Sequence, residues 1–526
     1  MKKADYLLLF ILGVVIYFAF AFFQKVPGYM DAEYYYVQGM HLIAEHNLNE
    51  TFIWNYLNNP STLPVAGFSF WLPLTSFLAA AGIWMTGVKS FFAGRFLFLI
   101  MAAMIPVLTA KLTTYFLYGR RAAWLAGGLA LFSGLFFPYA TVTDTFTPFM
   151  FLGGFLMLVF VEITNIEIWS NRKVILLGLI GIIIGLMALT RSEGILWLLG
   201  GVLFLLLENR YKKETFRQFL IECSLVILCF GLIMIPWYIR NFQVFGSLYP
   251  PGNGLMLWLT NYDDLFVYPS YVLTFSRWAS QGISIAKDRF SALWLNLQTL
   301  ISAGGAVVLF PLMVIGFIRN WKKTVVIVAG VMLCLIGLVM SFAFPYAGAR
   351  GGFFHSLSSF QVLLWSFVPV GLEIIIQWGI KHRKWKLARS WIMFGAMLIV
   401  FAAGLSIFMF FTKLHRGVEG TPWNDTLASY LSVDRKLEGL TKNQNAIVMV
   451  NDPPGFSLAT GRRSVMIPSG NMDSILAACN TYNVAYLVLD QEREDIKRVF
   501  NSSDTKNKKF KLLFENGSMN IYEYVK

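Results

Sequence analysis

Charged residues are scarce in this sequence of 526 residues, of which only 14% are Asp, Glu, Lys or Arg. Soluble proteins carry roughly 25%. So little charge excludes intrinsic disorder, which requires a polar chain with few aromatic residues. Hydrophobic residues make up 57% and aromatic residues 16%, more than one aqueous core of this length can bury. The class that remains is a polytopic α-helical membrane protein, because uncharged runs of about 20 residues recur along the chain.

Cysteine and histidine are also scarce, with four and five residues. Cys223, Cys229 and Cys334 lie in apolar runs and Cys479 stands alone near the C-terminus, so no pair indicates a disulfide framework. No group of His and Cys has the spacing of a metal site. The sequence therefore indicates no metal and no other cofactor, and it leaves a divalent metal open.

Basic residues outnumber acidic ones by 43 to 29, which gives a net charge of +14. In a soluble protein this excess would indicate a nucleic-acid partner. In a membrane protein it marks the cytoplasmic loops, where Lys and Arg accumulate. We therefore expect the lipid bilayer, and not nucleic acid, to be the surroundings of this chain.

Eleven charge-poor runs are candidate membrane spans. They cover 6–23, 91–110, 122–140, 145–163, 174–190, 194–207, 219–237, 299–318, 324–344, 358–380 and 390–412. Whether a twelfth run, 66–86, also crosses the membrane is decided by the distribution of basic residues. If it does not cross and the N-terminus is inside, the inner loops hold 19 basic residues and the outer loops eight. If it crossed, the bias would point outward, against the positive-inside rule. We predict that 64–88, which contains Pro64 and Pro73, lies along the outer membrane surface.

Composition divides the chain near residue 412. Residues 1–412 form the transmembrane part, with long outer loops at 24–90 and 238–298. Residues 413–526 are polar and alternate helical and strand patterns, which predicts a small α/β domain. Eleven crossings from a cytoplasmic N-terminus place this domain outside the cytoplasm, on an integral protein of the plasma membrane.

Acidic residues mark two positions on the outer face. Asp31 and Glu33 follow the first span, where a low dielectric raises the pKa of a carboxyl group and suits it to act as a base or to position an acceptor. Asp144 is the only charge in the short outer loop before the span at 145–163, and it could meet Asp31 above the bundle. The alternatives are structural, with Asp31 as a helix cap and Asp144 as a solvated acid among the headgroups.

Basic residues share this outer face. Arg191, Arg240 and Arg350 lie in three separate outer loops, and His355 follows the last of them. Each arginine alone could simply extend to the phosphates of bulk lipid. Beside the acids they predict a site for a lipid phosphate, because the guanidinium fork matches phosphate oxygens. Arg240 and Arg350 are the main candidates, and His355 and Arg191 are further ones.

The order of these motifs resembles the GT-C superfamily of membrane glycosyltransferases. Within it, the sequence is most similar to glycosyltransferase family 39, which includes the protein O-mannosyltransferases and the lipid A aminoarabinose transferases. The motifs are an acid after the first span, an acid in the second short outer loop, the turn Thr190–Gly194 and the segment Pro236–Asn241. They cover about residues 1–240, and the later spans match by layout.

The resemblance implies a GT-C-like fold with interfacial helices, and an inverting transfer from a polyprenyl-phosphate sugar. It also implies that Asp31 and Asp144 are the family's two acids. Glu33 departs from the usual Asp-Glu pair, because Ala32 intervenes. Leu63 stands where relatives often carry a Lys or His before the proline of the interfacial segment.

We therefore expect a glycosyltransferase that moves a sugar from a polyprenyl-phosphate donor to a lipid, glycan or protein acceptor outside the cytoplasm. A phosphate leaving group needs mainly electrostatic stabilisation by cations. Asp-x-Glu alone is too little for a divalent metal site. Two alternatives stay open: a flippase or exporter of lipid-linked glycans, which would need a polar path through the membrane, and a non-catalytic envelope assembly protein.

Overall fold

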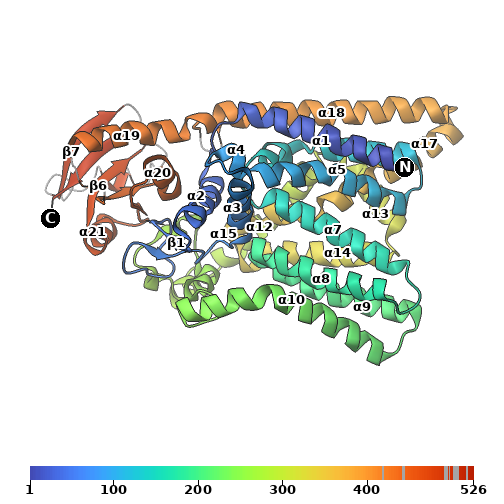
Figure 1. The fold of residues 1–526 in the computed structure, drawn as a ribbon, viewed down its shortest axis with the longest axis horizontal. Coiled ribbons are helices and arrows are strands. Elements are labelled where there is room, and N and C mark those ends of the chain that lie inside the picture. Colours follow the sequence, from blue (N-terminus) through green and yellow to red (C-terminus); the bar gives the residue numbers. More distant parts are fainter. Residues whose placement is uncertain are drawn as a thin grey trace.

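The computed structural model describes residues 1–417, 420–440, 443, 445–490, 496, 498–500, 509–516 and 519–525. A bundle of long helices forms most of the molecule, and a small domain with a sheet lies at one end of it (Figure 1). The N-terminus lies at the opposite end of the bundle (Figure 1). This confirms the predicted class, a helical integral membrane protein with a small C-terminal sheet region.

Nine helical segments of the described chain are long and apolar enough to cross a membrane. Six are single helices: α1 (Lys3–Phe23), α5 (Phe96–Phe116), α7 (Phe146–Thr164), α8 (Asn171–Thr190), α10 (Phe216–Phe245) and α18 (Leu387–Arg416). Three include short 3-10, π or α segments beside the main helix: η2 (Ser192–Leu196) with α9 (Trp197–Lys212), α14 (Thr324–Leu338) with η7 (Val339–Ala343), and α15 (Pro345–Ala347) and α16 (Phe353–Leu357) with α17 (Gln361–Arg383).

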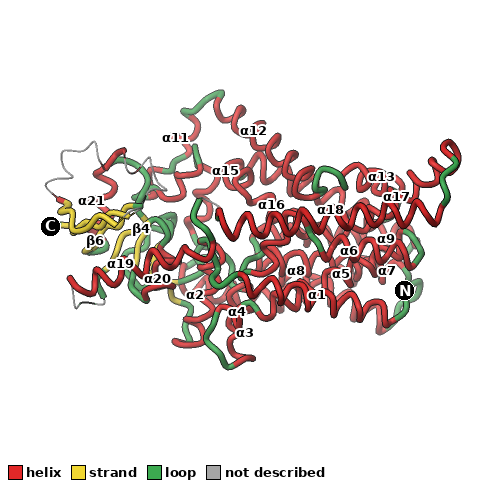
Figure 2. The backbone as a smooth tube through the Cα atoms, turned by 90° about the horizontal axis from the view of Figure 1, so that it is seen from above, coloured by secondary structure: helices red, strands yellow, loops and turns green. Residues whose placement is uncertain are grey.

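The other two predicted spans are bent or broken. α6 (Arg120–Leu131) and the 3-10 helix η1 (Gly134–Thr141) pass the same test only as a pair, with 59° between them. The run predicted at 299–318 ends in α13 (Phe310–Asn320), whose 11 residues rise only about 17 Å. A π turn separates α13 from α12 (Ser284–Thr299). Figures 1 and 2 place α12 nearer the domain and α13 nearer the N-terminus, but neither helix is long and apolar enough to cross by itself, so the structure does not show the predicted span at 299–318. Hydropathy measures the length of a run and cannot detect such an interruption.

The segment 64–88 does not contain a helix of spanning length. Its helix, α3 (Leu74–Thr86), begins after Pro73 and has 13 residues, whereas a crossing needs about 20. α3 packs against α2 (Met30–Glu45), and both lie between the bundle and the domain, with α3 running across the direction of α1 (Figure 1). The short helix α4 (Phe91–Gly94) then leads into α5. The structure therefore agrees with the prediction that this segment does not cross, while its place on the outer surface stays a prediction.

Small residues bring the spanning helices close together. A Cβ atom on Gly181 of α8 would lie 2.3 Å from the carbonyl oxygen of Val226 on α10. A Cβ atom on Gly371 of α17 would lie 2.2 Å from the carbonyl oxygen of Leu312 on α13. Lipid offers no hydrophobic drive for helix association, so such close backbone packing supplies the attraction.

The domain contains a six-stranded sheet with the strand order β2-β5-β4-β6-β8-β7. Its elements are β2 (Phe52–Ile53), α19 (Thr426–Leu440), β4 (Ile447–Val450), α20 (Pro453–Thr460), β5 (Ser464–Met466), α21 (Met472–Thr481), β6 (Val484–Leu489), β7 (Phe510–Asn516) and β8 (Met519–Tyr524). β2, β5, β4 and β6 run parallel, while β8 pairs antiparallel with β6 and β7.

The strand β2 comes from the first outer loop, so one sheet joins two parts of the chain that composition separates. A two-residue strand is too short to leave a periodic pattern. The same loop holds a small pair, β1 (Asn49–Glu50) with β3 (Val65–Ala66), and the second outer loop holds α11 (Phe275–Ala279).

The orientation of the bundle can be tested by cysteine labelling. We expect a cysteine at Ser432 of α19 to react with a membrane-impermeant maleimide in intact cells, because the domain lies opposite the N-terminus. Tyr118, exposed in the turn between α5 and α6, is the matched inner control and should react only after the membrane is opened. Labelling with the reverse pattern would overturn the orientation. A second outer position, Ser502, lies outside the described residues.

Candidate active site

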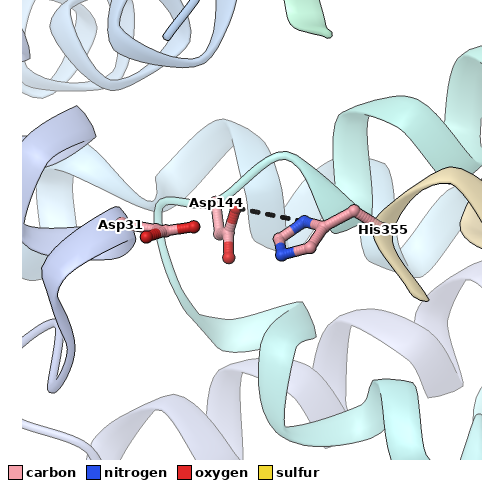
Figure 3. A group of neighbouring side chains, drawn as sticks. All are labelled: Asp31, Asp144 and His355. Atoms are coloured by element: carbon pink, nitrogen blue, oxygen red, sulfur yellow. Dashed lines mark ion pairs between the residues drawn. The ribbon is translucent and has the colours of Figure 1, made fainter. Parts of the chain in front are cut away.

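Three side chains from distant parts of the chain meet at the domain end of the bundle. Asp31 lies in the first turn of α2, Asp144 in the loop between η1 and α7, and His355 in α16. Each offers a ligand atom, and these atoms all lie within 4.8 Å of one another. Figure 3 shows the carboxylates of Asp31 and Asp144 side by side, with the imidazole of His355 on the far side of Asp144. The structure thus brings together the two predicted acids and one of the predicted basic residues.

Asp31 does not cap α2. The N-cap residue is Tyr29, and the helix begins at Met30, so Asp31 lies one residue inside the helix. The helix dipole still favours a carboxylate in this first turn. The capping alternative for Asp31 is therefore wrong, whereas an electrostatic contribution to the helix stays open.

Asp144 is fully buried, and both of its carboxylate oxygens accept hydrogen bonds. The hydroxyl group of Tyr29 donates to Oδ2 at 2.5 Å. The backbone N–H of Thr145 and its hydroxyl group donate to Oδ1. Burial raises the pKa of the Asp144 carboxyl, and the hydrogen bond from Tyr29 opposes this rise by favouring the charged form. Tyr29 is thus the side chain whose hydrogen bond most favours the charged form of this buried acid.

His355 is held in place by two contacts. Its ring stacks on Phe146 with 3.7 Å between the ring centroids. Its Nδ1 lies 2.8 Å from the hydroxyl oxygen of Thr145 and 3.8 Å from Oδ1 of Asp144. The imidazole is therefore connected to the acid through the hydroxyl group of Thr145.

Arg191 is the cation nearest to these groups. Its Nη1 donates to the hydroxyl oxygen of Thr145 at 3.3 Å, and its Nε donates to Glu193, which is buried. Ser356, next to His355, also donates to Glu193 at 2.7 Å. In the described part of the chain no hydrogen bond occupies Nη2 of Arg191. The guanidinium is fixed on two sides and keeps one edge for a ligand.

A separate buried network holds the two acid-bearing loops together. Arg95, at the start of α5, donates to the carbonyl oxygens of Ala21, Gln24 and Thr141 at 2.5, 2.8 and 3.1 Å. The hydroxyl group of Thr141 donates to the side chain of Gln24 at 2.6 Å. Because these bonds tie the end of α1 to the loop before α7, they fix the positions from which Asp31 and Asp144 extend.

The hydroxyl group of Thr143 adds a direct link, because it donates to the carbonyl oxygen of Ala32 at 2.7 Å. Ala32 neighbours Asp31 and Thr143 neighbours Asp144. The spacing of the two acids is thus set by the backbone as well as by Arg95.

Replacing Arg95 by Ala is expected to destabilise the protein by about 3 kcal/mol or more, since a buried polar group left without its partner costs about 1–3 kcal/mol and three carbonyl groups lose theirs. Thermal unfolding in detergent micelles measures this. Arg121→Ala, an exposed arginine at the other end of the bundle, is the matched control and should change stability by about 0.5 kcal/mol or less. Equal melting temperatures for the two variants would contradict the role of Arg95.

Glu33 faces away from this group. It is fully buried, and its Oε1 accepts a hydrogen bond from the hydroxyl group of Thr426 at 3.1 Å, at the start of α19. Residues two apart on a helix point roughly 200° apart, so Asp31 and Glu33 of α2 cannot both face Asp144. The position of Glu33 therefore indicates a connection to the C-terminal domain.

The other two predicted arginines contact different parts of the outer loops. Arg240 donates to the carbonyl oxygen of Gly67 at 2.6 Å, and its guanidinium lies over the ring of Trp237. Arg350 lies over the ring of Tyr262, 4.5 Å from its centroid. Among the described residues, neither arginine forms a hydrogen bond or an ion pair with Asp31 or Asp144.

Several residues of this site were not predicted from the sequence. Tyr29, Thr145 and Glu193 each lie within two residues of a predicted group, so the neighbours of a suspected acid or arginine were the available signal. Trp423, whose ring lies 5.4 Å from that of Tyr29, has no such signal, because nearly 400 residues separate them.

Comparison with known proteins supports the fold. The chain superposes on the oligosaccharyltransferase AglB from Archaeoglobus fulgidus, in complex with an inhibitory peptide and a dolichol-phosphate, with a TM-score of 0.60 and 14% identity over 94% of this chain and 70% of that one. ArnT from Cupriavidus metallidurans, bound to undecaprenyl phosphate, superposes with a TM-score of 0.57 and 13% identity over 100% of this chain and 99% of that one. Arabinofuranosyltransferase AftD from mycobacteria superposes with a TM-score of 0.50 and 13% identity over 99% of this chain and 42% of that one.

All three are GT-C membrane glycosyltransferases, so the GT-C fold expected from the sequence motifs is confirmed. No family model matches the chain, and no curated protein matches it by sequence.

Proposed function

Because this chain has the GT-C glycosyltransferase fold, we propose that it transfers a sugar from a polyprenyl-phosphate donor to an acceptor outside the cytoplasm. The observation that carries the proposal is the convergence of Asp31, Asp144, His355 and Arg191 from four separate elements at the domain end of the bundle. Transfer from a phosphate leaving group requires acids and a cation together in one partly exposed place.

The solved neighbours support the proposed donor class. ArnT holds undecaprenyl phosphate and AglB holds a dolichol-phosphate, and both are polyprenyl-type phosphates. In this chain we assign the phosphate first to Arg191, which presents an unoccupied edge of its guanidinium beside the acids. Arg240 and Arg350 supply further positive charge on the same end of the molecule.

The reaction we propose is a single displacement with inversion. The acceptor oxygen or nitrogen forms a bond to C1 of the sugar while the bond from C1 to the phosphate oxygen breaks. Asp31 accepts the proton of the acceptor, and Arg191 stabilises the charge that develops on the leaving phosphate. Asp144, which accepts the hydrogen bond from Tyr29, orients the acceptor and the first turn of α2.

A flippase is less consistent with where the charges lie. The buried charged residues of the described bundle lie near helix ends: Arg95, Asp144 and Glu193 toward the domain, and Asp5, Lys173, Glu208 and Glu222 toward the N-terminal end. A path for a polar headgroup would need such groups in the middle of the spans.

The proposed function is tested by two measurements. Mass spectrometry of cell-envelope glycans and glycoproteins after deletion of the gene should show the loss of one sugar. Purified protein given defined polyprenyl-phosphate sugars should then release polyprenyl phosphate when the acceptor is present. An unchanged envelope together with no release from any donor would overturn the proposal.

Asp31, Asp144 and His355 have the ligand types that a divalent cation accepts. However, both oxygens of Asp144 and Nδ1 of His355 already hold hydrogen bonds to Tyr29 and Thr145, which a cation would have to displace. A bound ion would act as a Lewis acid on the donor phosphate. We propose that Arg191 supplies this positive charge instead.

The metal-free proposal predicts that transfer by purified protein survives dialysis against EDTA within a factor of two or so. Arg191 supplies the required charge, and it is not removed by a chelator. Loss of activity on chelation, with recovery on adding Mn²⁺, Mg²⁺ or Zn²⁺, would show that a cation acts in this site. Turnover before and after dialysis, with the metal content measured in parallel, decides between the two results.

A further inference from the structure

Residues 423–426, here called the junction segment, lie at the start of α19, after α18 has ended at Arg416, and they contact the first outer loop. The side chain of Asn424 donates to the carbonyl oxygen of Phe23 at 2.9 Å and accepts from the backbone N–H of Lys25 at 2.8 Å. Thr426 donates to Glu33, as described above. The C-terminal domain is therefore fastened to the residues on both sides of Tyr29.

Trp423 fills the space between these two attachments. Its side chain is fully buried, and its ring lies 5.4 Å from that of Tyr29 and 6.0 Å from that of Tyr139. Gly28 has φ of +91°, and a Cβ atom there would lie 2.5 Å from Cγ of Trp423. The backbone before Tyr29 thus passes directly over the indole, which only glycine permits.

Tyr29 is the link to the chemistry. It is the N-cap residue of α2, two positions before Asp31, and its hydroxyl group donates to Asp144. A ring held on one face by an indole keeps its hydroxyl in one place. Without that support, the ring could turn away and leave the buried Asp144 short of one donor.

We propose that Trp423 is a positioning residue for the transfer reaction: it holds Tyr29 so that the tyrosine hydroxyl donates to Asp144. The inference rests on the proposed function and extends it, because it makes the C-terminal domain part of the active site. Trp423 acts on the rate through Tyr29 and has no contact with the reacting atoms.

The first expected result concerns the kinetic constants. Trp423→Leu keeps an apolar side chain but removes the ring, and we expect kcat to fall about 10–100-fold, since a misplacement of about 1 Å can cost 10²-fold. KM for the donor should change by no more than about twofold, because the phosphate is held by Arg191. Trp423→Phe, which keeps an aromatic ring against Tyr29, should recover most of the rate.

A double-mutant cycle separates positioning from general destabilisation. Tyr29→Phe removes the hydroxyl that Trp423 is proposed to position. If Trp423 acts through that hydroxyl, Trp423→Leu should lower kcat by no more than about twofold in the Tyr29→Phe protein, so the two losses are not additive. If both losses multiply in full, Trp423 is a structural residue and the proposal is overturned.

The matched control is Trp391→Leu. Trp391 is a buried tryptophan on α18, toward the other end of that helix, and it donates to Glu373. Its loss should lower the melting temperature without coupling to Tyr29→Phe. Size-exclusion profiles show which proteins are folded, and if Trp423→Leu is not recovered folded, the cycle is run with Trp423→Phe and the same non-additivity is expected.

Transfer by the wild-type protein distinguishes a failure of the role of Trp423 from a failure of the proposed function. Wild-type transfer with additive losses in the cycle overturns the role of Trp423 and leaves the proposed function intact. Wild-type transfer with non-additive losses supports both. A wild type that transfers no sugar from any polyprenyl-phosphate donor overturns both.

Discussion

An Asp31→Asn protein is expected to fold normally and to transfer sugar about 10²–10⁴-fold more slowly, the usual cost of losing a general base. Asparagine has nearly the same shape as aspartate but cannot accept the proton of the acceptor. The carboxyl group lies beside Asp144 and His355 in a partly exposed place, where an acceptor can reach it. Initial rates of polyprenyl-phosphate release by the purified protein measure the effect.

The competing role for Asp31 is favourable interaction with the dipole of α2, worth about 0.3–1 kcal/mol. That role predicts a slightly lower melting temperature with nearly normal transfer, which would refute catalysis by Asp31. Glu45→Gln, which neutralises an exposed acid at the other end of the same helix, is the matched control and should leave the rate unchanged.

An Arg191→Gln protein should lose most of its kcat/KM for the donor. Removing one partner of a buried charged contact costs about 2–5 kcal/mol, which corresponds to roughly 30- to 5,000-fold in kcat/KM. Arg191 is proposed to carry this contact because Glu193 and Thr145 fix two sides of its guanidinium beside the acids. Direct binding of polyprenyl phosphate, measured alongside the rate, should weaken in the same variant.

Three comparisons make this result decisive. Arg191→Lys keeps the charge but not the fork and should recover only part of the loss. Arg240→Gln and Arg350→Gln should lose less than Arg191→Gln, because their described contacts are with Gly67 and Tyr262 rather than with the acid group. A larger loss at Arg240 or Arg350 would restore the ranking that the sequence favoured.

The membrane class and the lack of a crossing at 64–88 were predictable because they depend on averages along the chain. Hydropathy sums over about 20 residues, and the basic residues of many loops contribute to one decision about sidedness. Such sums tolerate local irregularity, which is also why they could not detect the bend after α6 or the break before α13.

Parts of the candidate site were predictable for a different reason. Asp31 and Asp144 are rare charges next to long apolar runs, and their order along the chain resembles that of GT-C enzymes. The direction of the Glu33 side chain could have been predicted only with the start of α2 known. Residues two apart point to the same side in a strand but to nearly opposite sides in a helix.

The sequence by itself therefore determined that this is a helical membrane protein with a GT-C-like arrangement, and it identified the two acids. Only the tertiary structure decided which cation meets them, that β2 joins the C-terminal sheet, and that Trp423 packs on Tyr29. The reason is physical: hydropathy and charge bias are properties of continuous segments, whereas these contacts join residues 46 to more than 390 positions apart. Side-chain packing and hydrogen bonding select such pairs, and neither leaves a periodic trace in the chain.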